Sequence, residues 1–303
     1  MSIINSLIII FALIAIGLFA EKRKILDHAQ IEGFEAFLFK IGLPCYLFIA
    51  ALKYDIALLL HTGFIASYLT TFLIIAAVVL LVYYRRISTS AILIRALASG
   101  YSNAAIYALP IIIFLLKDPM AGIIGNILQV VVIQSIIVTI LSLIKHKEKS
   151  IARRLATILS TPLIVMPVIG LILNYLQFAP GFVITTVLES LGKSASTIAL
   201  FAFGLRLGTL KVTKASFDKS LFFIIFTKNV MHPTIAYCVG RYIFALDQYW
   251  LYSLVIITSA PTAYVVYIIS KQFSIEDELM KLVVTISAIA SLISLVVITA
   301  MLF

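Results

Sequence analysis

Long apolar blocks separated by short polar connections run the whole length of the chain. A helix needs about 20 apolar residues to cross the hydrocarbon core of a bilayer, so each block predicts one membrane-spanning helix. The ten predicted spans are Ile3–Ala20, Ile31–Leu52, Leu58–Tyr84, Ala91–Leu116, Ala121–Ile144, Leu155–Leu176, Gly181–Leu205, Ser220–Leu246, Tyr249–Ser270 and Asp277–Leu302. The chain is therefore predicted to be an all-α membrane protein.

Two of these spans carry polar residues and a proline in their middle. The fourth contains SGYSNAAIYALP, which ends at Pro110, and the ninth contains TSAPT, with Pro261. Proline removes a backbone donor and clashes with the preceding turn, so a helix is expected to break at each one. Within a bilayer, freed backbone groups persist only where protein or a water-filled cavity satisfies them. The two breaks together predict a binding site.

The overall composition supports this membrane assignment. Hydrophobic residues make up 63% of the chain and charged residues 12%, and the mean hydropathy is +1.16. Soluble domains carry about 45–50% apolar and ~25% charged residues. The net charge of +10 comes from short basic clusters between apolar blocks, which is a topology signal and not a nucleic-acid surface. Cys45 and Cys238 lie in apolar blocks, which favours burial over a disulfide or a metal site.

Lys and Arg are distributed unevenly between the connections. The odd-numbered connections and the helix ends beside them hold seventeen of these residues, whereas the other side holds three, Lys53, Lys117 and Arg241. Basic residues concentrate on the cytoplasmic side of a membrane protein. We therefore expect a multi-pass protein of the cell membrane with both termini on the extracytoplasmic side. The first block lacks a basic leader and a cleavage site, so it is expected to remain as a span.

The two halves of the chain repeat each other weakly. At an offset of 153 residues, Ile16, Gly17, Leu18, Lys40, Leu47, Phe48 and Leu52 align with Ile169, Gly170, Leu171, Lys193, Leu200, Phe201 and Leu205. Five spans per half invert the second half, and inverted repeats with broken helices are typical of secondary transporters. This predicts residues 1–144 as a first five-helix repeat, residues 145–154 as a cytoplasmic linker, and residues 155–303 as the second, inverted repeat.

The candidate substrate ligands at the breaks are Asn103 and Pro110 in the fourth span, and Ser259, Pro261 and Thr262 in the ninth. If the broken helices cross, the N-termini of two half-helices face each other, and their positive dipole ends favour an anion. The alternative is that these polar groups only bond neighbouring helices, which is common in packed membrane helices.

Further candidates lie in the fifth and eighth spans. Gln129 and Gln134 are expected to face the bundle, where they either contact the substrate or hydrogen-bond other helices. Lys228 shares a helix face with His232. An ionisable residue at bilayer depth indicates function unless it reaches the interface. This pair is therefore an anion contact or a proton relay, or else a buried link between helices.

Signatures of catalysis are absent from the sequence. It contains no His-Glu-x-x-His motif, no Gly-rich phosphate loop and no acidic pair in adjacent spans. The chain is predicted not to be an enzyme and to use no cofactor and no metal. Acids at bilayer depth are nearly missing, with Glu189 the deepest, which argues against a carboxylate-based sodium or proton site.

Short motifs in a fixed order give the chain a family resemblance. They are EKRKIL after the first span, IGLPCYLF, SNAAIYALP, LQVVVIQ, TPLIVMPVIGLILN, IALFAFGLRL and SAPTAYVVYIISKQF. In order and spacing they resemble the auxin efflux carrier family, which includes plant PIN-formed auxin carriers and bacterial malate or malonate permeases.

This resemblance implies ten spans in two inverted repeats, divided into a scaffold and a transport domain. It also implies that helices 4 and 9 break at prolines and cross, with an organic anion bound beside the crossing and movement of elevator type. The matching positions are Asn103, Pro110, Gln129, Gln134 and Pro261. The chain departs from the pattern at Ala108, where a glycine is usual, at Thr197, where a proline is usual, and at the charged Lys40 and Lys193.

The sequence thus predicts a secondary transporter of a small organic anion, such as a mono- or dicarboxylate. A sodium-coupled symporter of the bile acid symporter type and a non-transporting membrane sensor are the alternatives. The expected partners are the substrate anion and the lipid bilayer, with no nucleic acid. A homodimer, the coupling ion and the direction of transport stay open.

Overall fold

The computed structural model describes residues 3–53, 61–145, 160–209 and 218–302. Over these ranges the chain is helical and contains no β-strand apart from one isolated bridge. Most of the predicted linker 145–154 lies outside the described residues, as do the basic residues Lys211 and Lys214. The helices fall into two compact units that are discontinuous in sequence, Met1–His61 with Ala105–Ile124 and Leu155–Leu210, and Thr62–Ala104 with Gly125–Arg154 and Lys211–Phe303.

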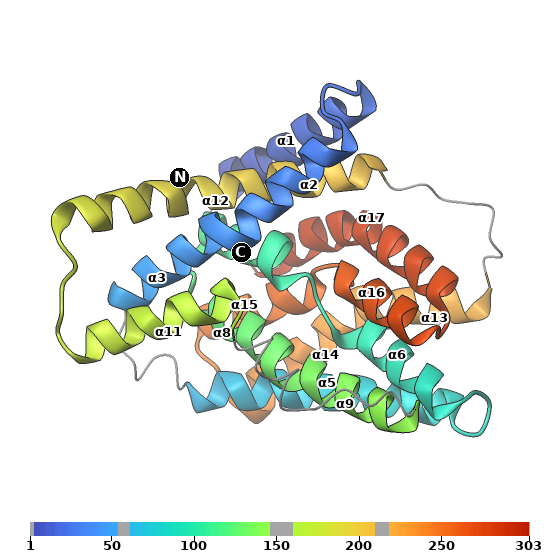
Figure 1. The fold of residues 1–303 in the computed structure, drawn as a ribbon. Helices are drawn as coiled ribbons and strands as arrows, with labels where there is room; N and C mark the ends of the chain where they lie inside the picture. Colours follow the sequence, from blue (N-terminus) through green and yellow to red (C-terminus); the bar gives the residue numbers. More distant parts are fainter. Residues whose placement is uncertain (1–2, 54–60, 146–159, 210–217, 303) are drawn as a thin grey trace. The chain divides into compact units, whose positions relative to one another are not determined.

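The first unit is built on close helix pairs. Its helices are α1 (Ile3–Lys22), α2 (His28–Phe37), the π-helical segment η1 (Leu38–Gly42), α3 (Leu43–Lys53), α7 (Leu109–Leu116), α11 (Pro162–Tyr175) and α12 (Phe182–Thr209). Helix α1 packs along α12, and α11 packs along α3 (Figure 1). A Cβ on Gly170 would lie 2.7 Å from the Phe48 carbonyl oxygen, so only glycine lets α11 and α3 approach this closely.

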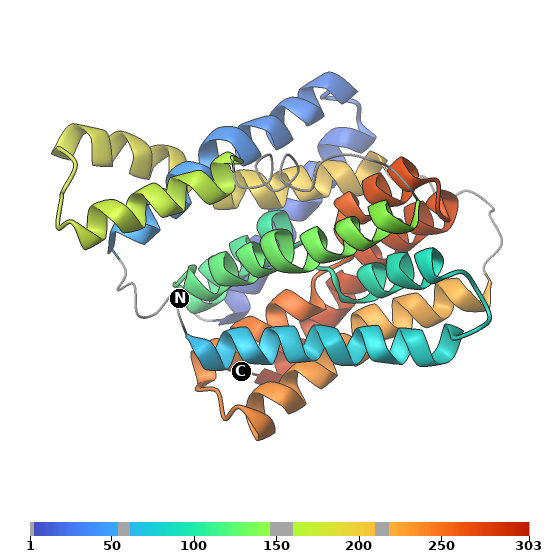
Figure 2. The ribbon, with the colours of Figure 1, turned by 60° about the horizontal axis from the view of Figure 1, so that its bottom comes forward.

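The second unit contains α5 (Thr62–Tyr83), α6 (Thr89–Gly100), η3 (Leu128–Gln134), α9 (Ser135–Ile144), α13 (Lys219–Phe226), η4 (Thr227–Met231), α14 (His232–Cys238), η5 (Val239–Ile243), α15 (Gln248–Ser259), α16 (Tyr264–Phe273) and α17 (Asp277–Leu302). Helices α8 (Met120–Ile127) and η2 (Ala104–Ala108) cross the boundary between the units. Side-chain caps begin several of these helices, as when Asp218 accepts from the Leu221 N–H. Helix α5 packs against α14 and α15 (Figure 2).

Six helices of the described part are long and apolar enough to cross a membrane. They are Ile4–Lys22, His28–Lys53, Thr62–Tyr83, Met120–Ile144, Lys219–Ile243 and Asp277–Leu302, and shorter apolar helices cover Thr89–Gly100, Ala104–Leu116 and Pro162–Tyr175. Large apolar side chains such as Leu81 and Phe182 lie exposed on these and other helices, as expected for a surface in contact with lipid. The chain is therefore a helical, multi-pass membrane protein, while the count of ten spans stays a prediction.

The break in the fourth predicted span does not lie at Pro110, so this part of the prediction is wrong. Helix α6 ends at Gly100, and Tyr101 already has extended backbone angles (φ −98°, ψ 115°). Pro110 is instead the second residue of α7, directly after the π-helical η2. The helical run Ala104–Leu116 continues through Pro110, and its irregularity is the π-helical winding of η2 just before the proline. The ninth span breaks where predicted, since α15 ends at Ser259 and Pro261 follows.

Candidate functional site

The two non-helical segments cross and pair within the second unit. Ser102 and Thr262 form an antiparallel bridge. The Asn103 N–H donates to the Pro261 carbonyl at 2.8 Å, and the Ala263 N–H donates to the Tyr101 carbonyl at 3.3 Å. Each segment thus supplies the backbone partners that the other lost when its helix ended. This satisfies the rule that irregular backbone at membrane depth must be paired by protein.

Thr262 holds the crossing to two further helices. Its hydroxyl donates to the Ala98 carbonyl at 2.7 Å, in the last turn of α6. Its backbone N–H donates to the Ser287 hydroxyl on α17 at 3.1 Å. The last carbonyls of a helix have no intrahelical partner, so this hydroxyl provides one for α6. Thr262 is 2% exposed, so these two hydrogen bonds position the crossing and do not face solvent.

Gln129 and Gln134 mark the two ends of the π-helical segment η3, and both bond the first break. The Gln129 Oε1 accepts from the Ser102 N–H at 2.5 Å, and the Gln134 Oε1 accepts from the Tyr101 hydroxyl at 2.8 Å. Gln129 is 1% exposed, and its Nε2 has no hydrogen-bond partner among the described residues. A buried amide with an unused donor is costly unless another group binds it. The crossing therefore presents a free N–H donor.

Lys228 brings a buried amine to the same crossing from the π-helical segment η4. Its Nζ donates to the Ser102 hydroxyl at 2.6 Å and to the Thr258 carbonyl at 3.0 Å, and it lies 3.2 Å from the His232 Nδ1. Both side chains are buried, with Lys228 0% and His232 1% exposed. Among the described residues no carboxylate pairs with Lys228, whereas Arg95 in the same unit is paired with Glu276 at 2.7 Å. A positive charge without a carboxylate favours an anion nearby.

Two helix N-termini begin at the crossing. Segment η2 starts at Ala104, two residues after Ser102, and α16 starts at Tyr264, two residues after Thr262. The N-cap residue of α16, Ala263, makes no side-chain capping bond. The positive dipole end of α16 is thus not neutralised by its own cap, and such an end attracts anions.

Most of the predicted site residues come together here. The second unit holds Asn103, Gln129, Gln134, Lys228, His232, Ser259, Pro261 and Thr262. Ser259 is fully buried, but its hydroxyl donates to the Ile256 carbonyl of its own helix, at 2.8 Å. Pro110 belongs to the first unit and has no described bond to these residues.

The structure adds three residues that the sequence did not single out as ligands. Ser102 is bonded by Gln129 and Lys228, Thr258 offers its carbonyl, and Tyr101 bonds Gln134. The polarity of Ser102 is visible in the sequence. A backbone carbonyl such as that of Thr258 gives no sequence signal, because every residue has one.

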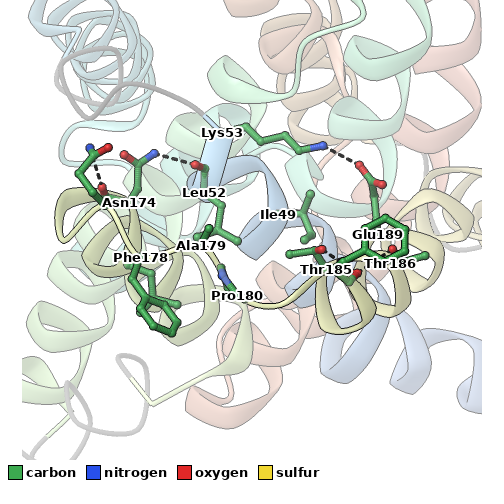
Figure 3. A pocket seen from close by; sticks show the side chains of 13 residues that line it. Ile49, Leu52, Lys53, Asn174, Phe178, Ala179, Pro180, Thr185, Thr186 and Glu189 are labelled. Atoms are coloured by element: carbon green, nitrogen blue, oxygen red, sulfur yellow. Dashed lines mark hydrogen bonds and ion pairs between the residues drawn. The ribbon is translucent and has the colours of Figure 1, made fainter.

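Two neighbouring cavities lie in the first unit, apart from these residues. One, of about 470 Å³, is lined by residues that include Asn174 and Glu189 (Figure 3). The other, of about 330 Å³, is lined in part by Lys117 and Lys193. Glu189 binds Lys53 at 2.6 Å and Lys193 at 3.4 Å, so both lysines share this carboxylate.

Comparisons with known proteins agree with the geometry. Residues 2–161 and 150–299 match the family described as "Membrane transport protein". Over 141 residues the chain is 28% identical to a protein of Rhizobium meliloti (strain 1021) named "Putative malonate transporter". That match covers 46% of this chain and 42% of the relative, so the chain spans less than half of the relative it matches. Because the family match covers nearly the whole chain, this protein is a member of the membrane transport protein family, as its resemblance to auxin efflux carriers predicts.

Proposed function

We propose that the protein carries a small organic anion of the mono- or dicarboxylate class across the cell membrane. The observation that carries this proposal is the set of unneutralised positive groups at the crossing. Gln129 has an unused N–H donor, Lys228 has no carboxylate partner among the described residues, and α16 begins there without a side-chain cap. An ionised carboxylate accepts hydrogen bonds and carries the complementary charge. The name of the Rhizobium meliloti relative, with malonate as its substrate, supports the same class.

In this proposal the substrate binds beside Gln129 and Asn103, and Lys228 acts on it through charge. All three N–H donors of the ammonium are directed to protein atoms, so Lys228 is not the primary hydrogen-bond donor to the substrate. Pro261 and Thr262 set the backbone of the crossing, and Gln134 holds Tyr101. Pro110 lies inside the helical run Ala104–Leu116 and is not among the proposed ligands.

We also propose ten spans in two inverted repeats with both termini outside. Glycine contacts in the first unit support the repeat. A Cβ on Gly17 would clash with the Phe201 carbonyl, and a Cβ on Gly170 would clash with the Phe48 carbonyl. The offset of 153 residues carries Gly17 to Gly170 and Phe48 to Phe201, so each of these two contacts is the repeat counterpart of the other. The contact between α1 and α12 therefore has a counterpart between α11 and α3.

The proposed mechanism is alternating access of elevator type. All described hydrogen bonds of the crossing join residues of the second unit, so that unit can carry the site as one body. Elevator movement requires a site that travels with one unit. The first unit, with its close glycine-mediated helix pairs, would then be the scaffold, and a homodimer would join two scaffolds.

Uptake by the purified protein in proteoliposomes tests the function. Vesicles loaded with unlabelled malonate or malate should exchange it for the labelled anion, and protein-free vesicles should not. Asn103→Ala should lose this exchange while it keeps the elution profile of the folded protein. Lys193→Ala, which changes an exposed lysine of the first unit, is the matched control and should exchange normally. Failure of the folded wild-type protein to move any mono- or dicarboxylate would refute the proposal.

A further inference from the structure

The surroundings of the Lys228 amine resemble those of a small bound cation. The side chain is 0% exposed, and three groups from three different elements lie within hydrogen-bond distance of Nζ. They are the Ser102 hydroxyl at 2.6 Å, the Thr258 carbonyl at 3.0 Å and the His232 Nδ1 at 3.2 Å. An ammonium has three N–H donors, so this set uses every one of them.

Two of these ligands come from the two broken helices. Ser102 lies in the first break, and the Thr258 carbonyl lies in the last turn of α15, next to the second break. The C-terminal end of a helix carries the negative end of its dipole and favours a cation. In transporters with discontinuous helices, unwound carbonyls and the C-terminal ends of half-helices coordinate sodium. Nζ therefore occupies a position whose oxygen ligands suit a sodium ion.

Arg95, another buried cation of the second unit, is neutralised in a different way. Arg95 is 6% exposed and binds Glu276 through two of its nitrogens, at 2.8 and 2.7 Å. Lys228 has only neutral ligands among the described residues. A buried amine keeps its proton only where its neighbours supply acceptors for the N–H groups, and an ionisable residue at bilayer depth indicates function.

We infer that the Lys228 ammonium is a resident cation that takes the place of a dissociable coupling sodium ion at the crossing. The inference rests on the proposed transport function and adds how the charge of the bound anion is balanced. Because the ammonium is covalently tethered, it stays with the second unit whether or not an anion is bound. The structure thus assigns sodium-independent transport to this chain, and the site discriminates against a second cation because its ligands are occupied.

Removal of the lysine side chain tests this inference without any substrate. Lys228→Ala leaves the Ser102 hydroxyl and the Thr258 carbonyl without their cation, and the missing atoms leave room for a small ion. The melting temperature is measured in sodium chloride, methylammonium chloride and choline chloride at equal ionic strength. Lys228→Ala should melt lower than wild type in choline and gain about 3–6 °C in sodium or methylammonium, the rise expected at roughly ten times the dissociation constant.

Matched proteins make the result decisive. Wild type and Lys193→Ala should melt equally in all three salts, and Lys228→Met should gain nothing because its side chain fills the space. A sodium-dependent rise for wild type would overturn the inference, as would a Lys228→Ala protein that no cation stabilises or that fails to fold in every salt. If a cation restores Lys228→Ala but no carboxylate is transported, the proposed function fails and the resident cation stands.

Discussion

Replacement of Gln129 by leucine removes both polar atoms of its amide, and each loss has its own measurable effect. The Oε1 is the partner of the Ser102 N–H at 2.5 Å, and the side chain is 1% exposed. Leucine has a similar volume but no acceptor, so the Ser102 N–H would be left buried and unpaired. An unsatisfied buried donor costs about 1–3 kcal/mol. Since 1 kcal/mol shifts the melting temperature of a protein of this size by about 2–4 °C, we expect Gln129→Leu to melt roughly 2–12 °C lower.

Loss of the Gln129 Nε2 is also expected to lower the affinity of the protein for the substrate anion. This donor has no partner among the described residues and is expected to bind the substrate carboxylate. A hydrogen bond to a charged group contributes about 1.5–3 kcal/mol. Because 1.4 kcal/mol corresponds to a factor of ten, Gln129→Leu should raise the dissociation constant of the anion by about 10–150-fold.

Thermal melting of the detergent-purified protein, with and without a carboxylate, measures both effects. The melting temperature without ligand reports stability, and the rise on addition of ligand reports affinity. Gln134→Leu is the matched control, because it also loses one acceptor, at 2.8 Å, but its side chain is only half-buried and its partner is the Tyr101 hydroxyl, not a backbone N–H. A Gln129→Leu protein with wild-type melting and a wild-type ligand response would refute the role assigned to both amide atoms.

Two further changes test the packing within each unit. Gly170→Ala should destabilise the protein by about 1–3 kcal/mol, because the new Cβ would meet the Phe48 carbonyl at 2.7 Å. Gly33→Ala is the control and should not be destabilised, because no atom lies within 4 Å of its Cβ. Equal melting temperatures of the two variants would contradict this prediction. Arg95→Lys should lower the free energy of unfolding by about 1.5–3 kcal/mol, because one ammonium cannot replace the two hydrogen bonds from Arg95 to Glu276. An unchanged melting temperature would show that the bidentate contact does not contribute to stability.

Part of this site can be derived from the sequence because its signals are local. Pro261 ends a helix through its own covalent structure, so the second break is visible without any partner. Lys228 and His232 are four residues apart, which places them on one helix face and in contact at 3.2 Å. The charge asymmetry and the apolar blocks are likewise properties of neighbouring residues, and they suffice to identify a multi-pass membrane protein.

The first break is different because its cause lies far away in the chain. Tyr101, Ser102 and Asn103 include no proline, yet the helix stops there because the segment around Pro261 offers its backbone as a partner. Ser102 and Thr262 are 160 residues apart, and Lys228 lies 126 residues from Ser102. Sequence reasoning favoured Pro110 because it assigns a break to the nearest proline, and it could not see a pairing that the tertiary fold creates.

The π-helical segments explain why both glutamines reach the crossing. In an α-helix, residues five apart point in directions about 140° apart, so Gln129 and Gln134 would face different neighbours. In η3 the hydrogen bonds run from residue i to i+5, which places the second residue above the first on one side. Both side chains then bond adjacent residues, Ser102 and Tyr101. Segment η4 carries Lys228 to the same crossing, so the altered winding of two helices concentrates the amides and the buried amine where the broken helices meet.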